Sequence, residues 1–241
     1  MGQRGRPRTF DRDAAIDSAM HLFWEHGYES TSLSQLKAAI GGGISAPSFY
    51  AAFESKEALY KEALERYMAI YGKVTRSLHD TSIPPREGVF LALMRSARMQ
   101  IESGHPKGCM VALGVVGASS TGSEAVTQWL RDVRSRTRAG FRACVERGIE
   151  RGELRRSTDP ASLSVAFDCF FQGLSVLARD RVRHAAIEKA VTDAMGIWDA
   201  AVDQPAPSRP AAAAGPRPES VHAPSERPDR RRAAGATEGS R

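Results

Sequence analysis

A short stretch near the N-terminus carries small hydroxyl side chains, a tyrosine and a lysine at close spacing. Ser45 and Ser48 are followed by Tyr50 and then by Lys56. Serine hydroxyls donate to or accept from base edges and phosphates, and a neighbouring alanine or proline offers apolar contact to a thymine methyl group. Tyrosine and lysine side chains bind phosphate oxygens. These residue types suit recognition of a nucleic acid, provided that a helix presents them together.

The surrounding sequence predicts a helix, a tight turn and a second helix. Ser32 and Gln35 form a capping box, which satisfies two backbone amides at a helix start. Apolar residues recur at helical spacing as far as Ile40. The glycines at 41–43 then end the helix, because glycine adopts left-handed backbone angles easily. Ser45 caps the second helix, and the whole arrangement is typical of a unit that enters a DNA major groove.

Further predicted helices surround this pair, and the sequence predicts no sheet. Asp11 caps a first helix over 10–26. The apolar face of this helix should hold the helix that Ser45 caps, called the reading helix below, at a fixed angle. A CMVALGVVGA run at 109–118 is apolar, but no second strand-like run exists to pair with it, so we expect a short buried helix. The other expected helices cover 55–78, 86–103, 124–152, a segment from about 160 capped by Asp159 or Thr158, and 187–202.

Bulk composition fits a globular protein with an anionic partner. The chain has 241 residues, 41% hydrophobic content and a net charge of +6. No run approaches the ~20 apolar residues of a membrane span, and the N-terminus lacks the apolar core of a signal peptide. Cys109, Cys144 and Cys169 lie too far apart for a disulfide framework or a metal motif. We therefore expect a cytoplasmic protein without a metal or other cofactor.

Both ends of the chain are predicted to be flexible. Residues 1–9 form a basic arm whose Arg4, Arg6 and Arg8 suit phosphate or minor-groove contact, although a solvated tail is the alternative. Residues 204–241 are rich in Pro, Ala, Arg, Ser and Gly, and cannot bury enough apolar surface to offset the entropy of ordering. We expect this tail to be disordered.

Two segments, LFWEHGYESTSL at 22–33 and ISAPSFYAAFESKEALY at 44–60, resemble the TetR/AcrR family of transcriptional regulators. The resemblance covers roughly the first quarter of the chain. One departure is the turn at 41–43, where three consecutive glycines replace the single glycine usual in the family.

The resemblance implies an all-α protein with two functional parts. Residues 10–56 would form a three-helix helix-turn-helix domain that binds double-stranded DNA, with the helix at 55–78 as a linker. Residues 79–203 would form a helical domain for effector binding and dimerisation. By resemblance, Thr31, Tyr50 and Lys56 contact phosphates. The full set of candidate DNA-binding residues is Arg4, Arg6, Arg8, Thr31, Lys37, Ser45, Ala46, Pro47, Ser48, Tyr50 and Lys56.

In the family, helices after the reading unit enclose a pocket for a small molecule. Apolar or soft residues are the candidates here, with ordinary core packing as the alternative for each. They are Phe90, Met94, Met99, Cys109, Met110, Trp129, Phe141 and Phe170, together with His105 in the preceding loop.

Cys109 is the more specific candidate, because it follows a loop with His105 and Lys107, whose positive charge would favour a thiolate. Some members of the family sense oxidants or electrophiles through cysteine. The alternative is a buried cysteine that acts only as a small apolar residue.

The last two predicted helices have broad apolar faces, which suit a four-helix interface between two copies. The family dimerises through these helices, so the resemblance implies a homodimer, with intrachain core as the alternative. The expected interface residues are Phe167, Phe171, Leu174, Ile187, Val191, Met195 and Trp198.

Other functions fit the sequence less well. No G-x-S-x-G, P-loop or dinucleotide motif occurs, and the histidines lack metal-ligand spacing, which argues against an enzyme. A helical adaptor with a non-functional helix-turn-helix is the second alternative, but intact Tyr50, Lys56 and the basic arm argue against it. We therefore predict a ligand- or redox-responsive repressor that binds a palindromic operator as a dimer. The arginine-rich outer face of the helix at 124–152 fits a solvated surface better than a second DNA site.

Overall fold

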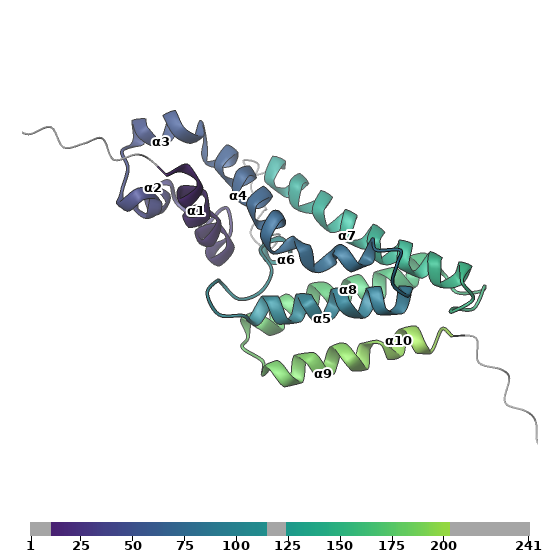
Figure 1. The fold of residues 1–241 in the computed structure, drawn as a ribbon. Helices are drawn as coiled ribbons and strands as arrows, with labels where there is room; N and C mark the ends of the chain where they lie inside the picture. Colours follow the sequence, from purple (N-terminus) through teal and green to yellow (C-terminus); the bar gives the residue numbers. More distant parts are fainter. Residues whose placement is uncertain (1–10, 115–123, 203–241) are drawn as a thin grey trace, which may run out of the picture. The chain divides into compact units, whose positions relative to one another are not determined.

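The computed structural model describes residues 11–114 and 124–202, and all the regular elements in these two ranges are helical, as predicted (Figure 1). The predicted arm, the tail and the turn at 119–123 lie outside the described residues. The α-helices are α1 (Arg12–His26), α2 (Leu33–Ala39), α3 (Ala46–Phe53), α4 (Lys56–Ile70), α5 (Pro85–Ile101), α6 (Met110–Leu113), α7 (Glu124–Glu150), α8 (Pro160–Arg179), α9 (His184–Ala194) and α10 (Gly196–Asp199). Two 3₁₀ helices, η1 (Ile40–Gly42) and η2 (Gly72–Leu78), complete the fold.

Predicted capping residues begin five of these helices, which are α1, α2, α3, α4 and α8. The Asp11 carboxylate accepts from the Ala14 amide at the start of α1, and the Ser55 hydroxyl caps α4 in the same way. Asp159, rather than Thr158, caps α8. The capping box at the start of α2 is complete, since side chain and backbone bond in both directions. These bonds satisfy amides that have no partner within the helix.

The continuous helix predicted over 55–78 is wrong, because α4 ends at Ile70 and the tighter η2 follows. Packing against α5 accounts for the change. The Ser77 hydroxyl donates to the Gly88 carbonyl at 2.9 Å, and a Cβ on Gly88 would lie only 2.9 Å from the Ser77 carbonyl oxygen. Leu78 is fully buried at the end of this segment. Close approach to α5 therefore outweighs continuation of a straight helix.

Two other predicted helices are also shorter or interrupted. Within the described residues, the helix expected at 109–118 is the single turn α6, which ends at Gly114. The last helix is divided into α9 and α10 around Met195, just before Gly196, which has low helix propensity.

Two groups of buried apolar residues hold the fold together. The first joins α1, α2, α3 and α4 to α6 and the N-terminal half of α7. The second lies among α5, the C-terminal half of α7, α8, α9 and α10. The helix-turn-helix therefore shares a core with α6 and with part of α7.

By length and composition alone, helix α8 is apolar enough to cross a membrane, with a mean hydropathy of 1.5 over its most apolar window. This differs from the expectation that no run approaches the apolarity of a membrane span. One side of α8 packs on α7 and α5, and Phe167 and Leu174 are buried there. The core therefore accounts for part of this apolar character, and the outer face accounts for the rest.

Candidate functional site

The first turn of α3 presents the small side chains that the sequence predicted. Ser45 is the N-cap, and its hydroxyl accepts from the Ser48 amide at 3.2 Å. The two serine hydroxyl oxygens lie 2.8 Å apart. Ser45, Pro47 and Ser48 are exposed, and Ala46 is half-buried. A pair of hydroxyls on an exposed helix start can exchange hydrogen bonds with bases or phosphates.

The other side of α3 is fixed to the core. Phe49 and Phe53 are fully buried, and their ring centroids lie 5.6 Å apart. Tyr50, by contrast, keeps 51% of its surface exposed. The helix therefore has one anchored face and one free face, which is the arrangement that a reading helix needs.

The glycine turn sets the angle between α2 and α3. Gly41, Gly42 and Gly43 all have positive φ, at 59°, 76° and 106°. The Ile44 amide donates to the Lys37 carbonyl at 2.9 Å, which closes the turn. Residues with a Cβ rarely adopt these backbone angles, so the three-glycine turn is a structural requirement here. Lys37 is half-buried at its edge.

Lys56 begins α4 and lies beside the aromatic ring of Tyr28. Its Nζ atom is 4.2 Å from the Tyr28 ring centroid. Partial burial lowers the pKa of Lys56, while the nearby Glu29 carboxylate acts in the opposite direction. Lys56 is the first residue of α4, and the backbone amides at a helix N-terminus also favour an anion. This position suits contact with a phosphate.

Ion pairs fasten α1 to α4 behind the reading helix. Arg66 forms two bonds of 2.8 Å with the Asp17 carboxylate, and Arg12 pairs with Glu62. Such paired geometry restricts orientation more than a single contact does.

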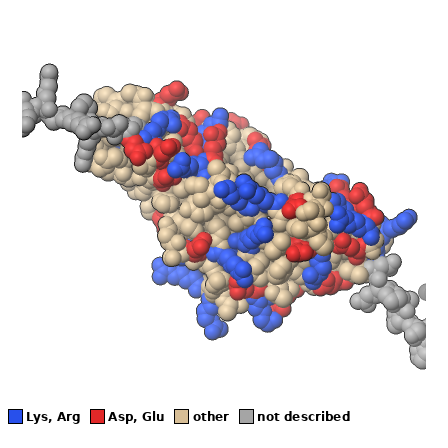
Figure 2. Space-filling model, in the orientation of Figure 1, with Lys and Arg blue, Asp and Glu red and all other residues tan. Residues whose placement is uncertain are grey.

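The surface over α2 and α3 is mostly uncharged in the view of Figure 2, with charged side chains concentrated below it.

The structure does not support a phosphate contact by the Thr31 side chain. Thr31 is fully buried, and its hydroxyl donates to the Gly27 carbonyl at 2.7 Å. The hydroxyl therefore satisfies the local turn, which was the alternative interpretation. Arg4, Arg6 and Arg8 lie outside the described residues.

A small apolar cavity of about 30 Å³ lies between α4, α5, α7 and α8. Cys109 is in its wall, and so is Met99. Tyr67 in the last turn of α4 and Tyr71, the C-cap of that helix, also line it. About 10–15 Å³ is needed for one water molecule, so this cavity is too small for an organic ligand without rearrangement.

The environment of Cys109 differs from the prediction. Lys107 donates to the carbonyls of Ile101 and Glu102, and His105 stacks on Trp24 with ring centroids 4.5 Å apart. Neither basic side chain is bonded to the thiol. Instead, the Tyr67 hydroxyl donates to the Cys109 sulfur at 3.3 Å. The expected influence of His105 and Lys107 on Cys109 is therefore wrong, and the basic residue that shares the cavity wall with Cys109 is Arg134.

The remaining effector candidates do not converge on one pocket. Phe141 is fully buried between Phe167 and Phe171 and is ordinary core. Trp129 instead lines a surface groove of about 300 Å³ between α4 and α7. Met110 belongs to the first buried group, while Phe90, Met94 and Phe170 belong to or pack against the second.

The seven residues expected at a dimer interface are buried within the chain, and this prediction is wrong. They face the second apolar group, with exposed fractions of 8% or less, and they are Phe167, Phe171, Leu174, Ile187, Val191, Met195 and Trp198. The opposite face of α8 is the exposed one. Val165 is 46% exposed and Val176 is 54% exposed, and Cys169 and Gly173 lie between them on the same face.

Sequence reasoning missed the polar and aromatic residues around the cavity. Tyr67, Tyr71, Arg134 and Thr137 line it beside Cys109. Partial burial, the largest influence, lowers the pKa of Arg134, and its guanidinium donates to the Val111 carbonyl at 3.3 Å. The spacing of the two tyrosines, i and i+4 at the end of α4, was the available signal, because that spacing places both on one helix face.

Comparison with known proteins agrees with this architecture. Residues 15–63 match the family model "Bacterial regulatory proteins, tetR family", and residues 90–203 match the model "Tetracyclin repressor-like, C-terminal domain". The HTH-type transcriptional repressor ComR of Escherichia coli (strain K12) is 32% identical over 200 residues, which cover 81% of this chain and 92% of ComR. The HTH-type transcriptional repressor DhaR of Mycobacterium sp. (strain GP1) is 27% identical over 69% of this chain and 81% of DhaR.

A solved structure is similar over nearly the same length. It is a cysteine mutant of the TetR family transcriptional regulator CifR in complex with a 26-base-pair double-strand operator DNA. It has 38% sequence identity and a TM-score of 0.73, and it covers 80% of this chain and 100% of the CifR chain. The helix-turn-helix, the helical second half and these relatives together establish that the chain belongs to the TetR family and is a DNA-binding transcriptional regulator.

Proposed function

We propose that the protein is a cytoplasmic, effector-responsive repressor that binds a palindromic operator as a homodimer. The exposed first turn of α3, held by buried Phe49 and Phe53 on a capped helix-turn-helix, is the observation that carries this proposal. The operator complex of the similar regulator CifR supports it.

On the DNA side, we assign base reading to the start of α3 and phosphate contact to the residues around it. Ser48 and its neighbours are short, so they fit closely against base edges and thymine methyl groups. Tyr50 and Lys56 carry the groups that suit phosphate oxygens. Since α3 carries no Arg, Asn or Gln, part of the sequence preference rests on DNA shape.

The second copy would pack on the outer face of α8. Val165, Cys169, Gly173 and Val176 form an exposed stripe of small and apolar side chains there. A Cβ added at Gly173 would have no other atom within 4 Å, so this part of the stripe is open. A twofold dimer uses the same patch on both subunits, and one continuous helix face provides such a patch.

The effector would enter the cavity beside Cys109. Because the cavity holds only about 30 Å³, a ligand must displace lining residues such as Met68 or Tyr71. Met68 is in the last turn of α4 and Tyr71 is its C-cap, and the first turn of the same helix carries Lys56. A ligand that binds the displaced arrangement more tightly would lower operator affinity by population shift.

Covalent modification of Cys109 is a second way to change the same cavity. An electrophile added to the sulfur would remove the hydrogen bond from Tyr67 and add volume where little is free. Operator affinity before and after alkylation, in the native chain and in Cys109→Ser, tests this. Equal loss of affinity in both proteins would exclude Cys109 as the sensor.

Selection of bound duplexes from a random DNA pool tests the proposed function as a whole. We expect a palindrome, two chains per duplex and an affinity that falls steeply with salt concentration. A chain that stays monomeric and retains no duplex at low ionic strength would refute the proposal.

A further inference from the structure

A buried hydrogen bond joins α1 of the DNA-binding unit to the loop that precedes α6. The indole nitrogen of Trp24 donates to the Gly108 carbonyl at 3.0 Å, although the two residues are 84 positions apart. Trp24 is 1% exposed, and its ring packs edge-on against Tyr67 and Tyr71. Since those tyrosines line the small cavity, Trp24 is in direct contact with the cavity wall.

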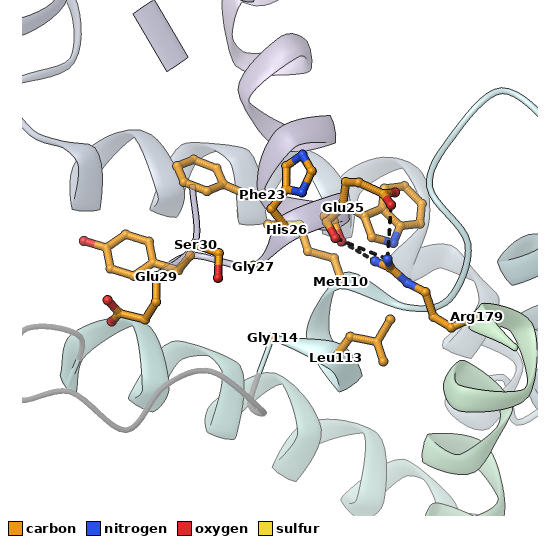
Figure 3. Close-up of a pocket in the computed structure, with 12 residues that line it drawn as sticks. Phe23, Glu25, His26, Gly27, Glu29, Ser30, Met110, Leu113, Gly114 and Arg179 are labelled. Carbon is orange, nitrogen blue, oxygen red and sulfur yellow. Dashed lines mark hydrogen bonds and ion pairs between the residues drawn. The ribbon is translucent and has the colours of Figure 1, made fainter. Parts of the chain in front are cut away.

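A second set of bonds ties the same end of α1 to the end of α8. The Arg179 guanidinium donates to the Trp24 carbonyl at 2.6 Å and to the Glu25 carbonyl at 3.2 Å. It also pairs with the Glu25 carboxylate at 3.3 Å. Figure 3 shows Arg179 reaching from α8 toward the last turn of α1. A cation at a helix C-terminus is favourable, and the helix end supplies carbonyls without partners in the helix.

The partners of Trp24 and Arg179 are themselves fixed. The Gly108 amide donates to the Gln100 carbonyl at the end of α5, and Lys107 holds two further carbonyls there. Gly108 has φ +82°, and a Cβ on it would lie 3.0 Å from the Ser175 carbonyl of α8. These contacts therefore hold the Gly108 carbonyl in a fixed position close to α8, the helix that carries Arg179.

These bonds restrict orientation in a way that the surrounding apolar contacts do not. The hydrophobic effect is non-directional, whereas hydrogen bonds weaken steeply off their preferred angle. A cavity of about 400 Å³, lined by Trp24, Glu25 and Arg179 among others, borders the contact, so the end of α1 has room to move.

The length of α1 turns a small rotation into a large displacement. Its 15 residues span about 22 Å, so a rotation of about 10° at its C-terminal end moves the other end by about 4 Å. That distance is close to the ~3.4 Å rise of one base pair. The tilt of α1, which Trp24 and Arg179 hold, would therefore affect the distance between the two α3 helices of a dimer.

We propose that Trp24 and Arg179 form a clasp that fixes the angle of the DNA-binding unit and so determines which half-site spacing the dimer accepts. This inference depends on the proposed function, in which two copies read one palindrome. Neither residue touches DNA in this assignment, and both act as positioning residues through α1.

The test uses the full chain and a series of duplexes that carry the selected palindrome with a central spacer shortened or lengthened by one or two base pairs. Trp24→Phe removes the indole donor and keeps an aromatic ring. Arg179→Met removes the guanidinium and keeps the aliphatic stem. Arg136→Met, at an exposed arginine of α7, is the matched control. Thermal melting of each variant accompanies the affinity measurements.

For the native chain and the control, we expect affinity to fall about tenfold for each wrong spacing, a discrimination comparable to that of a mismatched base pair. For both clasp variants, we expect the difference in affinity between the correct and a wrong spacing to shrink below about threefold. The melting transition should stay cooperative. Variants whose affinity falls by the same factor at every spacing would refute the clasp, because a merely structural role lowers all affinities alike. If the native chain selects no palindrome, the proposed function fails first.

Discussion

The ammonium group of Lys56 lies 4.2 Å from the centre of the Tyr28 ring, at the first residue of α4. The ring holds the cation at a helix end whose own amides attract anions. Partial burial, the main influence, lowers the pKa of Lys56, so a phosphate beside it would favour the charged form again. A bound phosphate would therefore be favoured both by the backbone amides at the start of α4 and by the positive charge of Lys56.

Lys56→Ala should weaken binding to all duplexes by a similar factor. The dependence of affinity on salt should also become shallower, with the slope falling by about one for each subunit bound. Fluorescence anisotropy at several salt concentrations measures both effects. Lys189→Ala, at an exposed lysine of α9 paired with Asp193, is the control and should change neither. An unchanged slope in Lys56→Ala would show that this lysine does not contact a phosphate.

Tyr50→Phe isolates one hydroxyl group on the exposed side of α3. The ring should stay in place because it packs edge-on against Phe49, with centroids 5.6 Å apart. We expect weaker binding to specific and random duplexes alike, by at least about tenfold, as for loss of one hydrogen bond to a charged group worth about 1.5–3 kcal/mol. A loss confined to one operator sequence would mean that Tyr50 reads a base.

Ser48→Ala and Ser45→Ala should have different consequences although their hydroxyls are 2.8 Å apart. Ser45 caps α3, so its loss should reduce the free energy of unfolding by about 1 kcal/mol. Ser48 caps nothing, and its replacement should leave stability unchanged and alter the preferred bases at one position in each half-site. Chemical denaturation and DNA selection on both variants separate the two roles. Identical sequence preference in the native chain and Ser48→Ala would contradict base reading by Ser48.

Charge on the outer face of α8 should disrupt the dimer without unfolding the chain. Val165→Glu together with Val176→Glu should raise the dimer dissociation constant at least about tenfold, because burying an unpaired carboxylate costs more than 1.4 kcal/mol. Phe141→Ala, inside the core, should instead lower stability by about 3–5 kcal/mol. Analytical ultracentrifugation and thermal melting distinguish these outcomes. A dimer that survives both glutamates would place the interface elsewhere.

The three thiols should react with iodoacetamide in a fixed order. Cys169 is exposed, Cys109 is partly exposed, and Cys144 is buried. Burial, the largest influence, raises the pKa of Cys144 in spite of Arg147 beside it, so less of this thiol is thiolate at a given pH. Because Cys169 lies on the face of α8 where the second copy would pack, the order is read on the chain with Val165→Glu and Val176→Glu, which should be monomeric. There we expect Cys169 to react first and Cys144 last, with the rate at Cys144 rising further at alkaline pH. Mass spectrometry of peptides over time gives the order, and early labelling of Cys144 would contradict the buried position.

Features that depend on neighbouring residues could be predicted from the sequence. Asp11, Ser32, Ser45 and Ser55 each accept a backbone bond three residues ahead, so their type and spacing were enough to place four helix starts. The exposed side of α3 followed in the same way, because Phe49 and Phe53 mark its buried side. Hydrophobic spacing failed for 55–78, where contact with Gly88 converts the end of a helix into η2.

The sequence by itself determined a helix-turn-helix and the exposed side of α3, because caps, turns and motif spacing act within a few positions of the chain. The tertiary structure alone decided which face of α8 is free, since hydropathy records that Phe167 and Val165 are apolar but not what covers them. It also decided the bonds of Trp24 to Gly108 and of Arg179 to Trp24, which join residues 84 and 155 positions apart. Such pairs meet only when distant helices pack, and no local pattern marks them.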